Sequence, residues 1–276
     1  MPLKFRQIVG LLFITAFCNL AFAQTVTPTS VTITKNKLQA KLNVTNLIAL
    51  DLLVEFENSI GLSANNIDIS ATLVTPSDAS VLDRLTSNDI SLISTFPVVV
   101  SISPKANSGF GFEGLASVEI YTKAVDYNAA MPARLFRSHA NGDFEDITTM
   151  VSAGSIRARG STGSFSDFVI VLDQRSHALK INDTFTQLNQ LVSQHSDLVS
   201  SVLATTLQAS LYNLQSALLI DDYLAALTVV DELITLVENA SNEKISTVWR
   251  SSNDLINMQG ELLTRLKTLR YSLRVS

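Results

Sequence analysis

The sequence contains few of the residues from which catalytic and metal sites are usually built. Its 276 residues include one cysteine, one tryptophan and three histidines, and only 16% are charged, whereas soluble domains average about 25%. The single cysteine excludes a disulfide framework. With 20 Lys and Arg against 25 Asp and Glu, the net charge is −5, which excludes the basic surface that nucleic-acid binding requires. The hydrophobic content of 46% is high enough to form a core, so a disordered chain is excluded as well.

The most continuous hydrophobic run lies at the N-terminus and is too short for a typical membrane span. Residues 8–17 form this run, and they lie between basic residues and small residues of the kind found before a cleavage site: Lys4, Arg6, Ala21 and Ala23. The pattern predicts a signal peptide over residues 1–23, cleaved between Ala23 and Gln24. We therefore expect an exported protein, periplasmic or extracellular. The alternative is an uncleaved N-terminal anchor helix.

Cys18 lies within the predicted signal peptide. Phe17 precedes it, where a lipoprotein signal needs a small residue, so a lipid-modified cysteine is excluded. Cleavage would leave a chain without cysteine. Cysteine nucleophiles, iron–sulfur clusters and thiolate zinc sites are then excluded, and we expect no cofactor.

The residues that form turns are confined to one half of the chain. All prolines lie at or before Pro132, and only Gly260 among the glycines lies beyond Gly163. This distribution is typical of a β domain followed by a helical domain. We predict an α+β fold in which an antiparallel β-sandwich of Ig-like or ZU5-like type (residues 24–174) precedes an antiparallel four-helix bundle (residues 175–276).

Several short segments of the first half alternate between apolar and polar residues, as strands with one buried face do. In one of them Leu38, Ala40, Leu42 and Val44 would share a face. A short helical turn is expected over residues 78–85. The predicted strands are residues 30–34, 37–44, 52–56, 67–74, 97–102 and 116–121.

In the second half, apolar residues recur at spacings of three and four, which predicts amphipathic helices. Asp221 and Asp222 are suitable N-cap residues before one of them. The last stripe runs from Ile245 to Leu273 and predicts a single helix in which Trp249 is a core residue.

Two stretches resemble known bacterial modules. Residues 133–172 are similar to the closing hairpins of bacterial extracytoplasmic β-sandwich modules, through residues 134–136, 142–148 and 165–170. This resemblance implies a compact sandwich and no particular activity.

Residues 211–246 resemble the FIMAH-type helical hairpin of secreted bacterial multidomain proteins. The matching residues are Leu214, Ala217, Tyr223, Ala225, Ala226, Leu233, Ile234, Val237, Lys244 and Ile245. The resemblance implies an accessory, non-catalytic module, and the whole chain looks like an uncharacterised secreted bacterial protein.

The candidate nucleophile is Ser166. The triplet Ser164-Phe165-Ser166 resembles the His-Phe-Ser site at which some sandwich domains cleave themselves, but Ser164 replaces the histidine that accepts the hydroxyl proton. Gly160 and Gly163, just before this triplet, are interpreted as hairpin-turn residues with positive φ.

The residues that could bind a metal ion are scattered in the sequence. His139, His177 and His195 have no metal-ligand spacing, and we interpret them as solvated loop residues, the alternative being a surface site assembled from distant histidines. The acidic group Asp143, Glu145 and Asp146 does not match a calcium loop. We therefore expect no metal.

Four arginines are predicted to lie on neighbouring strands and form a small basic patch: Arg134, Arg137, Arg157 and Arg159. The functional interpretation is a contact with an anionic glycan or a protein partner. The alternative is a solvated sheet face on which they pair with Asp143 or Glu145.

These observations favour a non-enzymatic interaction or structural protein of the periplasm or cell surface. Its working surface would be a sheet edge, through strand addition, or the groove between the two halves. We expect a protein or a cell-envelope glycan as partner, and no nucleic acid. The alternative is a secreted hydrolase or self-processing domain with Ser166 as nucleophile.

Overall fold

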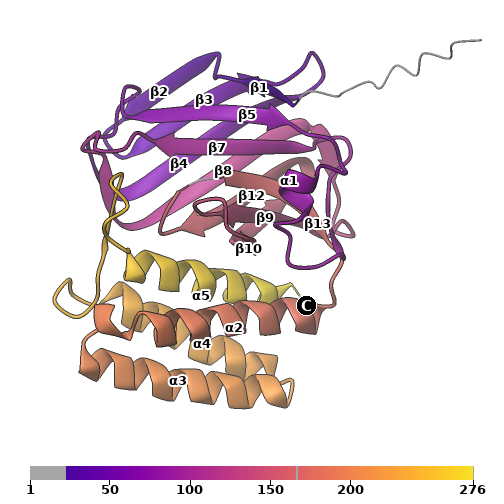
Figure 1. Cartoon of the computed structure of the whole chain (residues 1–276). Helices are drawn as coiled ribbons and strands as arrows, with labels where there is room; N and C mark the ends of the chain where they lie inside the picture. Colours follow the sequence, from indigo (N-terminus) through magenta and orange to yellow (C-terminus); the bar gives the residue numbers. More distant parts are fainter. Residues whose placement is uncertain (1–22, 166, 276) are drawn as a thin grey trace, which may run out of the picture.

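The computed structural model describes residues 23–165 and 167–275. The predicted signal peptide up to residue 22 and the candidate nucleophile Ser166 lie outside the described residues. Figure 1 shows two β-sheets in the upper part of the molecule and helices α2 to α5 beneath them. The fold is therefore α+β with a C-terminal helical part.

The first sheet has seven strands, all paired antiparallel. Its order is β1 (Gln24–Val26), β5 (Ile67–Leu73), β7 (Val98–Pro104), β13 (Asp167–Asp173), β9 (Ala133–Ser138) and β10 (Phe144–Asp146), and β6 (Ile90–Leu92) also pairs with β13. The short helix α1 (Ala79–Leu82) lies between β5 and β6 in the chain. Asp78 caps it by accepting a hydrogen bond from the backbone N–H of Ser80, which confirms the helical turn expected there.

The second sheet also has seven antiparallel strands. Its order is β11 (Thr148–Ser152), β12 (Gly154–Thr162), β8 (Gly111–Tyr127), β4 (Ala49–Ile60), β3 (Lys37–Asn43) and β2 (Ser30–Thr34), and β14 (Val248–Arg250) also pairs with β8.

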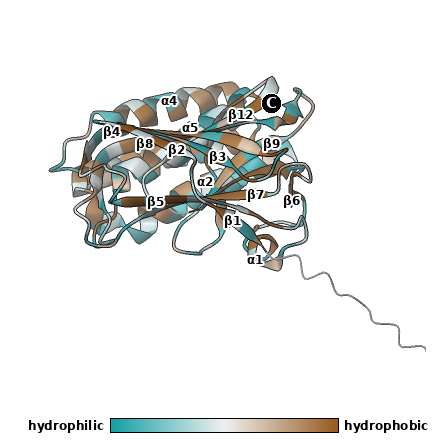
Figure 2. Ribbon diagram, turned by 90° about the horizontal axis from the view of Figure 1, so that it is seen from above, coloured by the Kyte–Doolittle hydropathy of each residue, from teal (hydrophilic) through white to brown (hydrophobic). Residues whose placement is uncertain are grey.

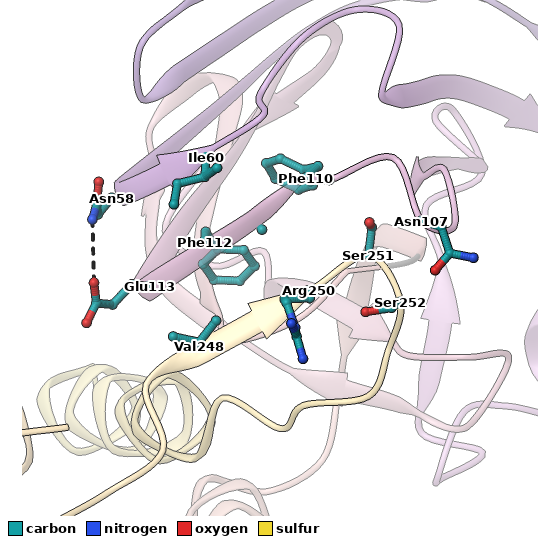
Figure 3. Close-up of a pocket in the computed structure, with 12 residues that line it drawn as sticks. Asn58, Ile60, Asn107, Phe110, Phe112, Glu113, Val248, Arg250, Ser251 and Ser252 are labelled. Atoms are coloured by element: carbon teal, nitrogen blue, oxygen red, sulfur yellow. Dashed lines mark hydrogen bonds between the residues drawn. The ribbon is translucent and has the colours of Figure 1, made fainter. Parts of the chain in front are cut away.

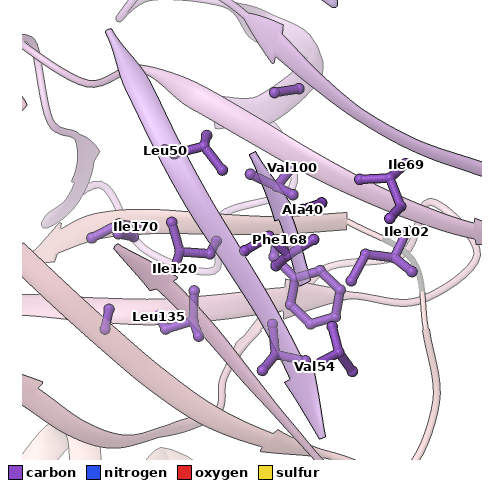
Figure 4. Packing of buried hydrophobic residues seen from close by; sticks show 14 of the residues in the cluster. Ala40, Leu50, Val54, Ile69, Val100, Ile102, Ile120, Leu135, Phe168 and Ile170 are labelled. Atoms are coloured by element: carbon purple, nitrogen blue, oxygen red, sulfur yellow. The ribbon is translucent and has the colours of Figure 1, made fainter. Parts of the chain in front are cut away.

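Apolar residues from both sheets pack into one core. In β3, every second residue is buried, which confirms the predicted alternation. Figure 4 shows side chains of the second sheet, such as Leu50 and Ile120, packed with Ile69, Val100 and Phe168 of the first. Figure 2 shows the molecule from above, with hydrophobic residues in brown, and brown segments occur along both the strands and the helices.

The helical part contains α2 (His177–Gln194), a 3-10 turn (Ser196–Leu198), α3 (Ser201–Leu219), α4 (Tyr223–Glu238) and α5 (Met258–Arg274). Asp222 is the N-cap of α4, as predicted, because its side chain accepts a hydrogen bond from the backbone N–H of Ala225. Arg175, in the short connection before α2, forms ion pairs with Asp173 of β13 and Asp183 of α2.

Helix α5 is buried along almost its whole length because it has neighbours on two sides. Its leucines, such as Leu262, Leu266 and Leu269, belong to the core shared by the helices, and the helix packs on α2 and α4. Its other side packs on β8, β11 and β12. The polar side of an amphipathic helix, which normally faces water, is here covered by the sheets.

The single helix predicted from Ile245 to Leu273 is wrong. Residues Val248–Arg250 form β14, and α5 begins at Met258 after its N-cap Asn257. Turn-forming residues separate the two elements, and one of them, Asn253, has a φ of 55°. Trp249 is a core residue, as predicted, but it lies in the core between the sheets.

Candidate binding site between the sheets and the helices

A cavity of about 430 Å³ lies where the sheets meet the helical part. The turn between β9 and β10, the residues that follow β12 and the N-terminal end of α5 line one part of it. The end of α2, Asn253 and residues 255–257 line the other part. Both halves of the chain therefore contribute to its walls.

A network of four charged side chains forms the floor of this cavity. Arg137 of β9 binds both carboxylate oxygens of Glu261 on α5, Nη1 to Oε1 at 2.7 Å and Nη2 to Oε2 at 3.0 Å. Arg265, one turn further along α5, binds Oε2 of Glu261 at 2.8 Å and Oε2 of Glu145 at 2.7 Å. Arg137 is only 3% exposed. The network joins β9 and β10 to α5 through buried, bidentate ion pairs.

The arginines determine the protonation state of Glu261. Burial alone would raise the pKa of its carboxyl, but the charges and hydrogen bonds of Arg137 and Arg265 outweigh burial and hold that pKa well below its usual range. Burial alone would likewise lower the pKa of Arg137, and Glu261 and Glu145 instead raise it. Glu261 and Arg137 are therefore both charged at neutral pH.

The Ser164 hydroxyl contacts two members of this network. Its Oγ donates a hydrogen bond to Oε1 of Glu261 at 2.8 Å and accepts one from Nη1 of Arg137 at 3.0 Å. A carboxylate with a lowered pKa is a weak proton acceptor, so Glu261 holds the hydroxyl in place and does not activate it.

Two glycines allow α5 to approach the sheets this closely. A Cβ on Gly163 would lie 2.6 Å from the backbone N of Glu261, and one on Gly260 would lie 2.9 Å from the carbonyl oxygen of Gly114. Neither Gly160 nor Gly163 has positive φ, which corrects the expected turn role. The hairpin between β11 and β12 instead turns at Gly154, with φ of 90°.

Two of the three histidines lie at the cavity. Nδ1 of His139 is 2.8 Å from the carbonyl oxygen of Phe165, and His195 is the C-cap of α2. His177 lies elsewhere, against the ring of Tyr223 with ring centroids 5.5 Å apart. Among residues 23–165 and 167–275, no group of three or more potential His, Cys, Asp or Glu ligands is arranged to hold a metal ion.

Glu145 and Asp146 point in different directions because they are successive residues of strand β10. Glu145 binds Arg265, whereas Asp146 is buried and binds Arg134 at 3.3 Å. Burial raises the pKa of Asp146, and this effect outweighs the opposing effects of Arg134 and Thr148. β10 therefore takes part in two separate ion-pair sites.

The four arginines do not form the single patch that we predicted from the sequence. Arg157 and Arg159 do share a face, where both bind Glu119, and their side chains are 41% and 40% exposed. Arg134 and Arg137 belong to the other sheet and are buried against α5, Arg134 next to Ser272 and over the ring of Tyr271. The two pairs of arginines lie apart because β9 and β12 belong to different sheets.

Sequence analysis did not identify Glu261 and Arg265 as site residues. Polar residues on one side of an amphipathic helix normally indicate a solvent-facing surface. The available signal was the Glu–Arg spacing of four residues, which also stabilises exposed helices.

A second hollow, of about 370 Å³, lies over the β4–β8–β14 segment (Figure 3). Ile60, Phe112 and Val248 line it, and Glu113 at its rim accepts hydrogen bonds from Asn242 at 2.6 Å and from Asn58. It does not bring several charged groups together as the cavity at α5 does, so we take the latter as the candidate site.

Comparison with protein families gives one result. Residues 11–276 match the model of a family of unknown function, DUF6689. The chain belongs to this family. The match confirms the interpretation as an uncharacterised domain, and export stays a prediction. No curated protein and no solved structure matches the chain. Within the part of the chain that the structure describes, no helix is long and apolar enough to cross a membrane.

Proposed function

We propose that this DUF6689 protein is an exported, non-enzymatic interaction protein of the periplasm or cell surface, and that its partner binds in the cavity between the sheets and the helices. In this proposal the two sheets act as a β-sandwich and α2 to α5 as a four-helix bundle. The observation that carries it is the pairing within the cavity, where Arg137 and Arg265 both bind the carboxylate of Glu261. A carboxylate held by two arginines favours a rigid surface for binding over a reactive centre.

The rim of the cavity supports contact with another macromolecule. Leu255 and Ile256 are 38% and 42% exposed, and Asp143 is among the polar residues that line the same cavity. An apolar wall beside a polar one is the usual composition of a protein interface. We therefore favour a protein segment as the partner, with a cell-envelope glycan as the other candidate.

Export is supported by the position of the first strand. β1 begins at Gln24, so cleavage after Ala23 would leave every described strand intact. The proposed form of the protein consequently has Gln24 as its first residue.

Site-specific cross-linking in cells tests the proposal. A photoreactive side chain at position 256 is expected to capture one species of defined mass. The same group at position 47 is the matched control, because Leu47 is an exposed apolar residue outside the cavity. The protein recovered outside the cytoplasm should begin at Gln24. Equal labelling at both positions, no labelling at position 256, or retention in the cytoplasm would contradict the proposal.

One contact favours the second candidate, self-processing at Ser166. Nδ1 of His139 lies 2.8 Å from the Phe165 carbonyl oxygen, and an N–H donor at this position would stabilise the negative charge that develops when the carbonyl is attacked. In that reaction the Ser166 hydroxyl would attack the Phe165 carbonyl carbon, and its proton would pass to the Ser166 nitrogen as the peptide C–N bond breaks. Water would then hydrolyse the resulting ester to give the Phe165 carboxylate and the free Ser166 hydroxyl.

The mass of the purified protein decides between the candidates. Self-processing predicts two fragments, one ending at Phe165 and one beginning at Ser166, and both should be lost in Ser166→Ala and reduced in His139→Ala. The interaction protein predicts a single uncut chain in all three proteins.

A further inference from the structure

The outer surface of helix α3 has no charged residues and is exposed to solvent. None of its residues Ser201–Leu219 is charged, although the chain has 45 charged residues in total. Val202, Tyr212 and Leu219 are 77%, 71% and 77% exposed. Figure 1 shows α3 as the lowermost helix, on the far side of the helical part from the sheets. Large apolar side chains exposed along one face of a helix are a feature of interaction sites on soluble proteins.

The exposed residues are spaced as in helices that pair. They follow one another at alternating intervals of three and four, and all are exposed: Val202, Thr205, Ala209, Tyr212, Ser216 and Leu219. A second set on the opposite side, which includes Leu203, Leu207 and Leu214, is buried in the helical core. The buried set already packs against the other helices of this chain. The six exposed residues form a second stripe, which we call the seam, with the spacing of residues that pack against a neighbouring helix.

We propose that this seam binds a second copy of the chain, with the two α3 helices antiparallel about a two-fold axis. In a two-fold contact, if one residue faces a second residue of the other copy, then that second residue faces the first one in return. The order of residues along one helix is therefore matched to the reverse order along the other. Here Val202 would face Leu219 of the second copy, Thr205 would face Ser216, and Ala209 would face Tyr212. Each pairing is chemically matched: large apolar with large apolar, hydroxyl with hydroxyl, and the smallest side chain with the largest.

The cost of covering this surface is low. The Thr205 hydroxyl already donates to the Ser201 carbonyl, and the Ser216 hydroxyl to the Tyr212 carbonyl, both at 2.9 Å. Burying them in a contact therefore leaves no hydroxyl hydrogen without an acceptor.

The charge distribution is compatible with the same occupant. Two copies of a chain with net charge −5 repel each other on average, and an uncharged seam removes this repulsion from the contact. Ile220 and Leu224, 74% and 78% exposed, extend the apolar surface beyond Leu219. They would contact the N-terminal end of α3 in the second copy. Asp221 and Asp222 lie beside them and disfavour an anionic membrane surface as the occupant.

Pairs of single-cysteine proteins test this arrangement on a Cys18→Ser background. Thr205→Cys protein mixed with Ser216→Cys protein is expected to give a disulfide-linked dimer on oxidation. Neither protein alone should, because equivalent positions would lie roughly 16 Å apart along the antiparallel helices, whereas a disulfide needs Cα atoms within about 7 Å. Rapid linkage within either single variant would overturn the antiparallel pairing.

Sedimentation measures the association itself. The unmodified protein is expected to sediment with twice the mass of one chain, and Ala209→Glu with the mass of one chain. Gln194→Glu, on the exposed end of α2, is the matched control and should remain a dimer. A monomeric unmodified protein, a dimer that Ala209→Glu leaves intact, or capture of vesicles or of another protein by a monomer would each overturn the proposal.

Discussion

A chain that ends at Gln174 is expected not to fold, although it contains every strand of the first sheet and six of the seven strands of the second. The missing strand is β14, whose Trp249 packs on Phe110, Phe112 and Phe165 with ring centroids 5.6–6.1 Å apart. Truncation removes this ring from the middle of an aromatic cluster. It also leaves the buried Arg137 without Glu261. Loss of a large buried aromatic side chain alone costs about 3–5 kcal/mol, which is a large part of the stability of a typical domain.

The measurement is circular dichroism and thermal unfolding of the truncated chain. We expect no cooperative transition. Trp249→Ala in the full chain isolates the contribution of the aromatic cluster and should lower the free energy of unfolding by about 3–5 kcal/mol. Leu255→Ala is the matched control, because Leu255 lies in the same connection but is 38% exposed. A truncated chain that unfolds cooperatively would show that the sheets do not need the helical part.

Glu261→Ala is expected to lower the free energy of unfolding by about 3–5 kcal/mol, because it leaves two arginines buried without their common partner. Arg137 and Arg265 are 3% and 8% exposed, so water hydrates them poorly, and the carboxylate that remains to them, Glu145, lies 3.5 Å from Arg137 and 2.7 Å from Arg265. Denaturant titration of both proteins measures this difference.

Glu119→Ala is the matched control for this experiment. Glu119 also binds two arginines, Arg157 and Arg159, but their side chains are about two-fifths exposed. Water can hydrate them once the carboxylate is gone, so we expect a loss of at most about 1 kcal/mol. Equal losses in the two variants would contradict the role assigned to the buried network.

The same carboxylate gives the stability a defined pH dependence. Because the pKa of Glu261 is lowered in the folded protein, its contribution is complete above the unfolded value of about 4.3. It is lost as the pH falls below that value toward the folded pKa. Glu261→Gln should therefore reduce the acid-induced loss of stability. Asp146 has a raised pKa and acts in the opposite sense.

Most of the strands and helices could be predicted, because the apolar periodicity of a strand or helix is visible in residues that are close in the sequence. The alternation in β3 and the cap of α4 at Asp222 are examples. Residues Val248–Arg250 are too few to display a period of two, and the apolar residues on either side of them have helical spacing. β14 was therefore hidden within a helical pattern.

The candidate site was less accessible to sequence analysis. Arginine is usually exposed, and Arg137 is buried only because Glu261, 124 positions later, faces it. No local pattern connects two such residues. The close approach of α5 to Gly163 is likewise a property of tertiary packing, and the sequence offered a turn as the simpler interpretation of that glycine.

The position of α5 also sets the order in which the chain can complete its structure during synthesis. The Asn257 side chain donates a hydrogen bond to the Gly114 carbonyl, a contact that spans 143 residues, and β14 completes the sheet beside it. At typical elongation rates, a ribosome needs on the order of ten seconds to add the residues between β8 and the end of α5. Contacts so distant in sequence also form slowly. The N-terminal half of the nascent chain thus stays unfinished during that interval, and its exposed sheet edge at β8 has no partner until β14 emerges.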